Sequence, residues 1–279
     1  MKNQQQQKET NNNIERDEQQ PRLSFSAVKT FRECGHRYKL EYLEGHKNET
    51  SNIHLVFGSS IHTAVEKGLS NKTVDMNGVF VTEFDKLLAE NKKQFPGCFR
   101  QPETVFQEFR AQGQTILSQT HEYFDATFPS YKIISQEEEI YIPIEGTDWM
   151  FKGFIDMVLE WNDKIIIIDS KTSTWGWDRW KKSDELVNLQ LQLYKAFWCK
   201  KHDITAEKDI KKVNVGFLLL KRTPKKNNLE FFRASGSPAK LEKATKLLKN
   251  AIFNIERKMF LKNRLSCNYC PFYKTELCP

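Results

Sequence analysis

The chain has 279 residues and a net charge of +7, and hydrophobic residues make up 39% of it, including 20 Phe. This composition can build a sizeable core in one large or two small domains, and it excludes wholesale disorder. The longest apolar runs, such as 165–168 and 215–220, fall far short of the roughly 18 residues that span a bilayer, and the N-terminus lacks the apolar segment of a signal peptide. We therefore expect a cytoplasmic protein with no membrane partner. The absence of a Gly-Lys dipeptide excludes a Walker A phosphate loop.

The N-terminal half is predicted to be helical. Residues 1–20 are polar and low in complexity, so we expect a disordered tail that ends before Pro21. Apolar residues at helical spacing then predict a first helix from Ser24 or Ser26 to about Gly45. Further helices are predicted at 59–68, near 79–95 and near 102–128.

The pattern changes to strands near Ile133. We predict strands at 133–144, 149–161, 164–172, 213–221 and 229–234, with helices at 184–200 and from Ser237 to about Leu261. These elements predict an α+β fold with a mainly antiparallel central sheet flanked by helices. We expect one domain over 21–279, comprising a helical part (21–130), a sheet core (131–235), and a C-terminal helix with a cysteine tail (236–279).

Two aspartates and a lysine lie on neighbouring predicted strands. Asn162-Asp163 has the composition of a two-residue hairpin turn. Such a turn would place Asp156 directly opposite Asp169, with Cβ atoms about 4.5–5.5 Å apart. Lys171, two residues beyond Asp169, would point to the same face.

Opposed carboxylates destabilise a sheet unless a cation lies between them. Mg²⁺ or Mn²⁺ favours such oxygen ligands, and Lys171 could orient or activate water there. The alternative is a hairpin whose ends emerge into solvent, where Lys171 makes an ordinary ion pair. A bare D-x-K pattern is short and usually has that simpler meaning, but the register favours a cation site.

The order of these motifs resembles the PD-(D/E)XK nuclease superfamily, specifically its RecB-like exonucleases. The resemblance spans residues 23–279, and its specificity comes from the shared order of several short motifs. Those motifs are Ser24-Phe25-Ser26 through Cys34, Gly58 to His62, Gly153-x-Ile-Asp156, Asp169-Ser170-Lys171-Thr172, and the Q-x-x-x-Y helix of Gln190 and Tyr194.

The resemblance implies a metal-dependent DNA exonuclease. Asp156 and Asp169, with His62 and the Ser170 carbonyl, would hold Mg²⁺ or Mn²⁺. Lys171 would position the attacking water and stabilise charge on the phosphate. The remaining motif residues, Gln190 and Tyr194, would support the site or touch DNA.

Each motif also has a simpler interpretation. An isolated histidine such as His62 is usually a surface or satisfied core residue. A Gln190–Tyr194 pair on a Leu-rich helix is usually ordinary amphipathic packing. The acidic residues at 137–139 could add a group to the site, although a solvated strand face is the simpler expectation.

Three cysteines cluster at the C-terminus: Cys267, Cys270 and Cys278. By spacing alone we favour structural Zn²⁺, because three thiolates and a fourth ligand suit a tetrahedral site. The iron–sulfur branch of the RecB-like nucleases, similar to the CRISPR-associated four-cysteine exonucleases, instead implies a [4Fe–4S] cluster completed by Cys34. The isolated residues Cys98 and Cys199 are expected to be buried or incidental thiols.

Residues 195–264 carry an excess of 13 positive charges. This basic block is a plausible strand-binding surface or a solvated face. We expect DNA, as single strands or duplex ends, to be the substrate, and recombination, repair or CRISPR-adaptation proteins to be possible partners. The alternative is a non-catalytic DNA-binding or scaffold subunit that keeps the fold and cluster without cutting.

Overall fold

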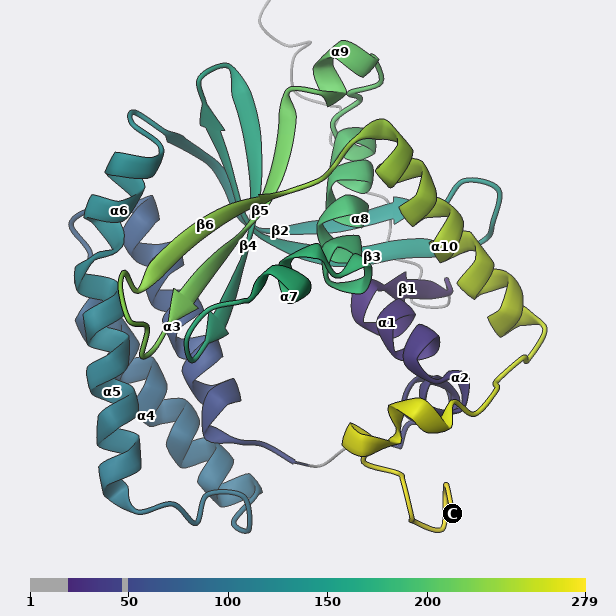
Figure 1. Ribbon diagram of the computed structural model, residues 1–279, viewed down its shortest axis with the longest axis horizontal. Coiled ribbons are helices and arrows are strands. Elements are labelled where there is room, and N and C mark those ends of the chain that lie inside the picture. The colour runs from purple at the N-terminus through teal and green to yellow at the C-terminus, as the bar shows by residue number, and fades with distance from the viewer. Residues whose placement is uncertain (1–19, 47–49) are drawn as a thin grey trace, which may run out of the picture.

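A six-stranded mixed sheet forms the centre of the protein (Figure 1). The computed structural model describes residues 20–46 and 50–279, so the predicted disordered tail lies outside the described residues except for Gln20. The strand order is β1-β3-β4-β5-β6, and β2 also pairs with β3; the β1–β3 and β4–β5 pairs are parallel and the other three are antiparallel. The strands are β1 (Arg22–Ser24), β2 (Lys132–Pro143), β3 (Met150–Trp161), β4 (Lys164–Ser173), β5 (Val213–Lys221) and β6 (Leu229–Ala234).

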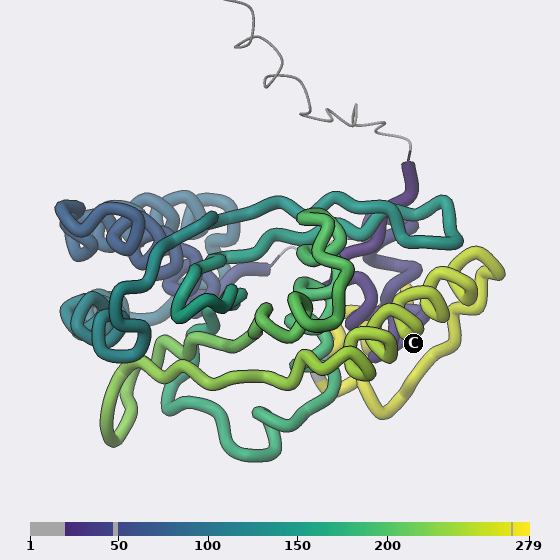
Figure 2. The backbone as a smooth tube through the Cα atoms, turned by 90° about the horizontal axis from the view of Figure 1, so that it is seen from above, coloured from purple at the N-terminus to yellow at the C-terminus, as the bar shows by residue number. Residues whose placement is uncertain are grey.

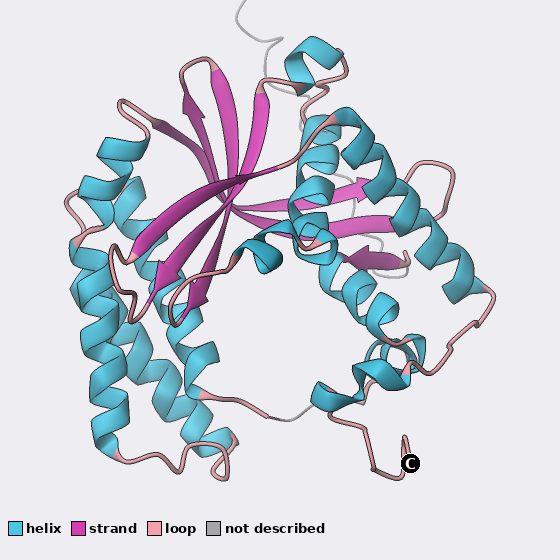
Figure 3. Cartoon of the chain, viewed as in Figure 1, coloured by secondary structure: helices cyan, strands magenta, loops and turns pink. Residues whose placement is uncertain are grey.

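Helices cover both faces of this sheet (Figures 2 and 3). One face carries α3 (Ile53–Ser70), α4 (Met76–Gln94), α5 (Glu103–Ser118) and α6 (Thr120–Thr127). The other carries α1 (Phe25–Glu33), α8 (Glu185–Lys201) and α10 (Pro238–Glu256). The short elements are α2 (Gly35–Tyr38), the π-helix η1 (Lys39–Leu43), α7 (Arg179–Ser183), α9 (Glu207–Ile210) and the 3₁₀-helix η2 (Arg264–Tyr269).

The apolar run of β4 is buried on both faces, which explains why it does not alternate with polar residues. Ile167 belongs to the core shared with α1, α8 and α10. Its neighbours Ile166 and Ile168 belong to the core shared with α3–α6. Asp169 follows this run and is only 1% exposed, so the strand carries a carboxylate into the interior.

β3 changes partner along one of its edges. Its residues 150–152 pair with β1 and its residues 157–161 pair with β4, whereas β2 pairs along most of its length. β2 pairs with one edge of β3, so β1 and β4 both pair with the other edge of β3, at different positions along it. Asp156 therefore lies where β3 has left β1 and has not yet joined the ladder of β4.

The first predicted helix, Ser24 to Gly45, is wrong as a single element. The backbone is extended at Cys34 (φ −163°, ψ 112°), which separates α1 from α2. Gly35 then approaches the C-terminal segment so closely that a Cβ would lie 3.1 Å from the nitrogen of Leu261. The break brings the N-terminal helices against the chain that leads to the cysteine tail.

The boundaries of two other predicted helices also differ. The second helix begins at Ile53 instead of Ser59, because the Asn52 side chain accepts hydrogen bonds from two backbone N–H groups of its first turn. The last helix ends at Glu256 instead of Leu261. Lys258 has φ 57°, a left-handed conformation that a helix does not continue through.

Candidate active site

Three carboxylates lie in a row across neighbouring strands. The β3–β4 ladder pairs Trp161 with Lys164 and ends at Met157 with Ile168, so the predicted register is confirmed and Asp156 falls opposite Asp169. On the other edge, residues 155 and 157 of β3 pair with residues 138 and 136 of β2. Glu137, with φ 47°, therefore lies opposite Asp156.

Two short contacts hold the aspartates. The Ser170 backbone N–H donates a hydrogen bond to Asp156 Oδ2 at 2.7 Å. Lys171 Nζ lies 2.7 Å from Asp169 Oδ2, and its side chain is 37% exposed whereas that of Asp169 is 1% exposed. The lysine therefore faces both the buried carboxylate and the solvent from which a substrate would arrive.

Burial controls the protonation of this group. It raises the pKa of Asp156 and of Asp169, and the nearby Lys171 ammonium offsets only part of this effect. The burial of Lys171 opposes its charge, but the two aspartates outweigh this and raise its pKa. The lysine stays cationic, while the paired carboxylates bind protons more readily than free ones in the absence of another cation.

Helix α3 adds two side chains one turn apart. His62 Nε2 is buried and has no hydrogen-bond partner among the described residues. Burial and then Lys171 lower its pKa to about 4, so the imidazole is neutral near pH 7 and its nitrogen lone pair is available. Burial, followed by a charge and a hydrogen bond from Glu137, raises the pKa of Glu66, which also feels Asp156.

Glu66 was not identified from the sequence. The signal that could have found it is its spacing, because His62 and Glu66 are four residues apart and share one helix face. That face is recognisable as part of the site only once β2 and β4 are known to pack beside it.

The acidic residues at 137–139 have three different environments. Glu137 is exposed but acts electrostatically on Asp156. Glu138 is only 9% exposed and pairs with Lys201 at 2.7 Å and His202 at 2.9 Å, so the expected solvated strand face is wrong for this residue. Glu139 lies 3.6 Å from Lys152.

Gln190 and Tyr194 join the site from α8. The Gln190 amide donates to the Tyr194 hydroxyl at 3.1 Å. Burial and then the Asp169 charge raise the pKa of Tyr194. Gly153 provides the space, because a Cβ there would lie 2.8 Å from Tyr194 Cε1. The glycine of the Gly-x-Ile-Asp motif is therefore required by packing.

The donor set fits a hard divalent cation. Asp169 Oδ2 is buried, and within the described chain its one polar contact is the Lys171 ion pair. Carboxylate oxygens and a neutral imidazole are ligands that Mg²⁺ and Mn²⁺ accept. In the described ranges, 20–46 and 50–279, no three His, Cys, Asp or Glu side chains already converge as a metal site.

Comparison with known families agrees with this geometry. Residues 22–279 match the family model described as the PD-(D/E)XK nuclease superfamily. The chain belongs to that superfamily. The mixed sheet flanked by helices is thus the α+β fold of a member of this superfamily.

One solved structure resembles this PD-(D/E)XK chain in fold. A protein from Eubacterium rectale described as a "putative exonuclease" superposes with a TM-score of 0.59 at 14% identity, covering 97% of this chain and 95% of its own. A protein named SSO0001 covers 85% of this chain and 91% of its own at 16% identity, with a TM-score of 0.35. No curated protein matches the chain.

No helix in the described part of the chain is long and apolar enough to cross a membrane.

Four of the six cysteines of this superfamily member lie together. A single pocket is lined by all four residues predicted to form a cluster: Cys34, Cys267, Cys270 and Cys278. Cys34 Sγ accepts a hydrogen bond from the backbone N–H of Asn263 at 3.4 Å, which ties α1 to the C-terminal segment. The structure forms no disulfide among the described cysteines. Cys199 lies elsewhere, and burial raises the pKa of its thiol to about 11.

Proposed function

We propose that the protein is a metal-dependent DNA exonuclease of the RecB-like type that hydrolyses phosphodiester bonds. One observation carries the proposal: the partly buried Asp156 lies opposite the buried Asp169, beside a cationic lysine. Opposed buried carboxylates are costly in a structural hairpin. A bound cation would offset the repulsion between the two carboxylates, and the lysine would attract a phosphate.

The proposed site residues have two separate roles, which are metal binding and stabilisation of the reacting phosphate. Asp156, Asp169, His62 and the Ser170 carbonyl would hold Mg²⁺ or Mn²⁺, which supplies Lewis acidity at the phosphate when bound. Lys171 orients the attacking water and stabilises negative charge that develops on the phosphate, because its ammonium is charged and reaches the solvent side of the site.

The remaining polar residues support these roles. The Gln190–Tyr194 hydrogen bond fixes the tyrosine ring over Gly153, at the edge of the carboxylate row. Glu66 and Glu137 form a second acidic pair beside Asp156. The raised pKa of Glu66 leaves one proton on this pair near neutral pH, and we propose that the remaining charge favours a divalent ion at the cation site.

We also propose a structural [4Fe–4S] cluster held by Cys34, Cys267, Cys270 and Cys278. Support comes from the pocket that all four thiols line, because they come from opposite ends of the chain. A ligand shared by these ends closes a very long loop and stabilises the fold. Zn²⁺ is the alternative occupant of the same thiolates.

The basic block at 195–264 contributes to DNA binding only in part. Lys195 is buried and donates to the Gly236 carbonyl at 2.8 Å, and Lys221 is buried and pairs with Glu230 at 3.2 Å. These two lysines are structural. On α10, Lys246 is exposed and Lys249 is half-buried, and we propose that these two lysines contact a phosphate backbone.

A cleavage assay tests the proposal. The substrates are single- and double-stranded DNA labelled at the 5′ or 3′ end, incubated with and without Mn²⁺. We expect stepwise release of short products that requires the metal and is absent in Lys171→Ala. DNA binding without metal-dependent cleavage would contradict the proposal and favour a non-catalytic DNA-binding subunit.

A further inference from the structure

The segment that follows the carboxylate strand presents two tryptophans to solvent. Trp175 is 77% exposed and Trp180 is 82% exposed. Both lie between the end of β4 and the start of α8, in the part of Figure 1 where α7 stands beside the sheet. Large aromatic side chains contribute to stability mainly when they are covered, so two uncovered rings within six residues indicate a binding surface.

This segment is anchored to the sheet. The ring of Trp177 packs 5.0 Å from that of Phe217 and 5.8 Å from that of Phe232. The Lys181 ammonium lies 4.8 Å above the same indole. Gly176 has φ 110°, so the backbone turns sharply between Trp175 and Trp177. Trp177 therefore anchors the segment to the sheet, whereas Trp175 remains exposed to solvent.

The exposed rings are close to the proposed catalytic lysine. Trp175 is four residues from Lys171, and four residues span at most about 14 Å. The path between them is fixed, because the Thr223 backbone N–H donates to the Thr174 carbonyl at 2.8 Å. A strand that reaches Lys171 can therefore contact Trp175 at the same time.

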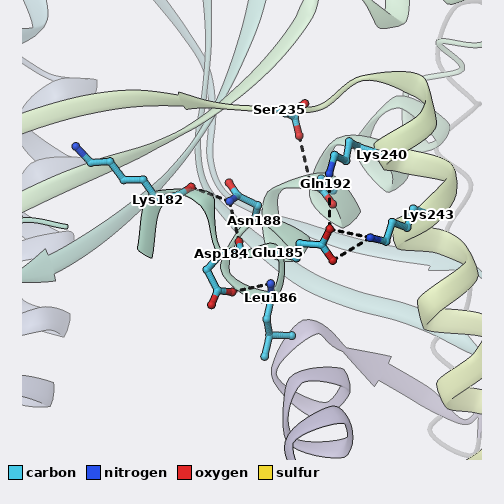
Figure 4. A network of polar contacts seen from close by, with 9 residues as sticks. All are labelled: Lys182, Asp184, Glu185, Leu186, Asn188, Gln192, Ser235, Lys240 and Lys243. Atoms are coloured by element: carbon cyan, nitrogen blue, oxygen red, sulfur yellow. Dashed lines mark hydrogen bonds and ion pairs between the residues drawn. The ribbon is translucent and has the colours of Figure 1, made fainter. Parts of the chain in front are cut away.

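Positive charge continues from this segment into a cavity of about 260 Å³ between α7, α8 and α10. Its charged lining is made of Lys182, Arg233, Lys240 and Lys243 with the carboxylate of Glu185, and Lys182 also forms an ion pair with Glu230. Figure 4 shows Glu185 beside the two α10 lysines, 2.8 Å from Lys243 Nζ and 3.9 Å from Lys240 Nζ. The excess of cations makes the cavity complementary to phosphate.

We propose that residues 174–183 form a stacking platform for single-stranded DNA, on which bases stack against Trp175 and Trp180 while the phosphates follow the cations toward the cavity. Unpaired bases expose both faces to aromatic rings, whereas bases in a duplex are already stacked on one another. The platform therefore selects single strands or frayed ends. This inference rests on the proposed nuclease function and names the substrate form it takes.

Binding measured without metal tests the platform separately from cleavage. The protein is titrated in EDTA with a fluorescent oligothymidine, with the same strand made abasic, and with a duplex of equal length. We expect Trp175→Ala and Trp180→Ala each to weaken oligothymidine binding roughly 5- to 100-fold. Binding of the abasic strand should change less than twofold, because its phosphates remain and its bases are gone.

A matched control is Phe253→Ala, which removes a 51% exposed aromatic ring from α10. We expect it to bind oligothymidine as wild type does. The conservative Trp175→Phe and Trp180→Phe variants should restore most of the affinity while losing the quenching of tryptophan fluorescence. Melting temperatures of all variants should match wild type, because neither exposed ring is packed.

Several results would overturn the inference. Unchanged oligothymidine affinity in the alanine variants would do so even if the wild type cuts DNA, and so would an equal loss on abasic and duplex DNA. Self-association that Trp180→Ala abolishes would assign the rings to a protein contact. A wild type that binds no DNA at all would reject the nuclease proposal itself.

Discussion

The Asp156 carboxylate accepts a hydrogen bond from the Ser170 backbone N–H at 2.7 Å, beyond the last ladder pair between β3 and β4. A side chain therefore takes the place of the backbone carbonyl that would continue an ordinary ladder. The bond holds Asp156 against the strand that carries Asp169, despite the repulsion between the two carboxylates. The fold therefore holds the two carboxylates together before a cation binds.

Replacing Asp169 with Asn should remove activity without unfolding the protein. Asp169→Asn keeps the shape of the side chain but removes its charge, so Mg²⁺ or Mn²⁺ affinity should fall at least tenfold and cleavage should disappear. Lys171 can turn to solvent because its side chain is 37% exposed. Metal titration, cleavage rates and melting temperature check this, with Asp209→Asn on α9 as the control. Unchanged metal affinity would mean that the cation binds elsewhere.

Lys171→Ala should separate chemistry from binding. The lysine is proposed to act on water and phosphate, so cleavage should fall by roughly 10²–10³-fold or more. Metal and DNA affinity should stay within about twofold of wild type, because its removal leaves the proposed ligands in place. The control is Lys211→Ala, whose side chain is 63% exposed on the surface. Near wild-type cleavage in Lys171→Ala would show that the active site is misplaced.

The metal-free protein should lose stability as pH rises. Burial raises the pKa of Asp156, Asp169 and Glu66, so the folded state retains protons that the unfolded chain releases above about pH 4. His62 acts in the opposite sense below about pH 6.5, because its lowered pKa of about 4 leaves it neutral in the folded state. The three carboxyl groups outnumber it, so the free energy of unfolding falls as pH increases from about 4 toward 8. Urea unfolding in EDTA across this range measures the slope.

One substitution and one metal addition test the cause of this pH dependence. Asp169→Asn should flatten it, and Mn²⁺ should restore stability most strongly at the alkaline end, where the carboxylates are ionised. Glu138 adds little to the slope. Burial raises its pKa, but its hydrogen-bond partners outweigh burial and lower the pKa to about 2, so its contribution to stability is lost only as pH falls below about 4.5. A metal-free stability that is flat from pH 4 to 8 would reject the buried-carboxylate explanation.

The strands and their register could be predicted because the information is local. The turn at Asn162-Asp163 determines which residues oppose each other, and both residues have the left-handed backbone that such a turn requires (φ 50° and 56°). Asp156, Asp169 and Lys171 were therefore located by counting from the turn. The apolar periods of the long helices were equally local, and α4 and α8 lie close to where they were predicted. The helix predicted near 102–128 is instead divided at Gln119 into α5 and α6.

Features that depend on tertiary contacts could not be predicted. The break at Cys34 follows from the close approach of Gly35 to Leu261, more than 200 residues away in the sequence. The role of Glu66 depends on Glu137, which belongs to another element. β1 has only three residues and exists because it pairs in parallel with Met150–Lys152. No local pattern specifies such partners.

The cysteine pocket gives the last prediction. Four thiolates around iron and sulfide should make anaerobically purified protein brown, with broad absorbance near about 400 nm and equal amounts of iron and sulfide. Cys267→Ser should bleach the protein and lower its melting temperature, because the tail loses its ligand-mediated tie to Cys34 and α1. Cys98→Ser is the matched control, since Cys98 lies outside the pocket and should leave colour and stability unchanged. Colourless protein with stoichiometric zinc would assign the four thiols to a zinc site and leave the nuclease proposal intact.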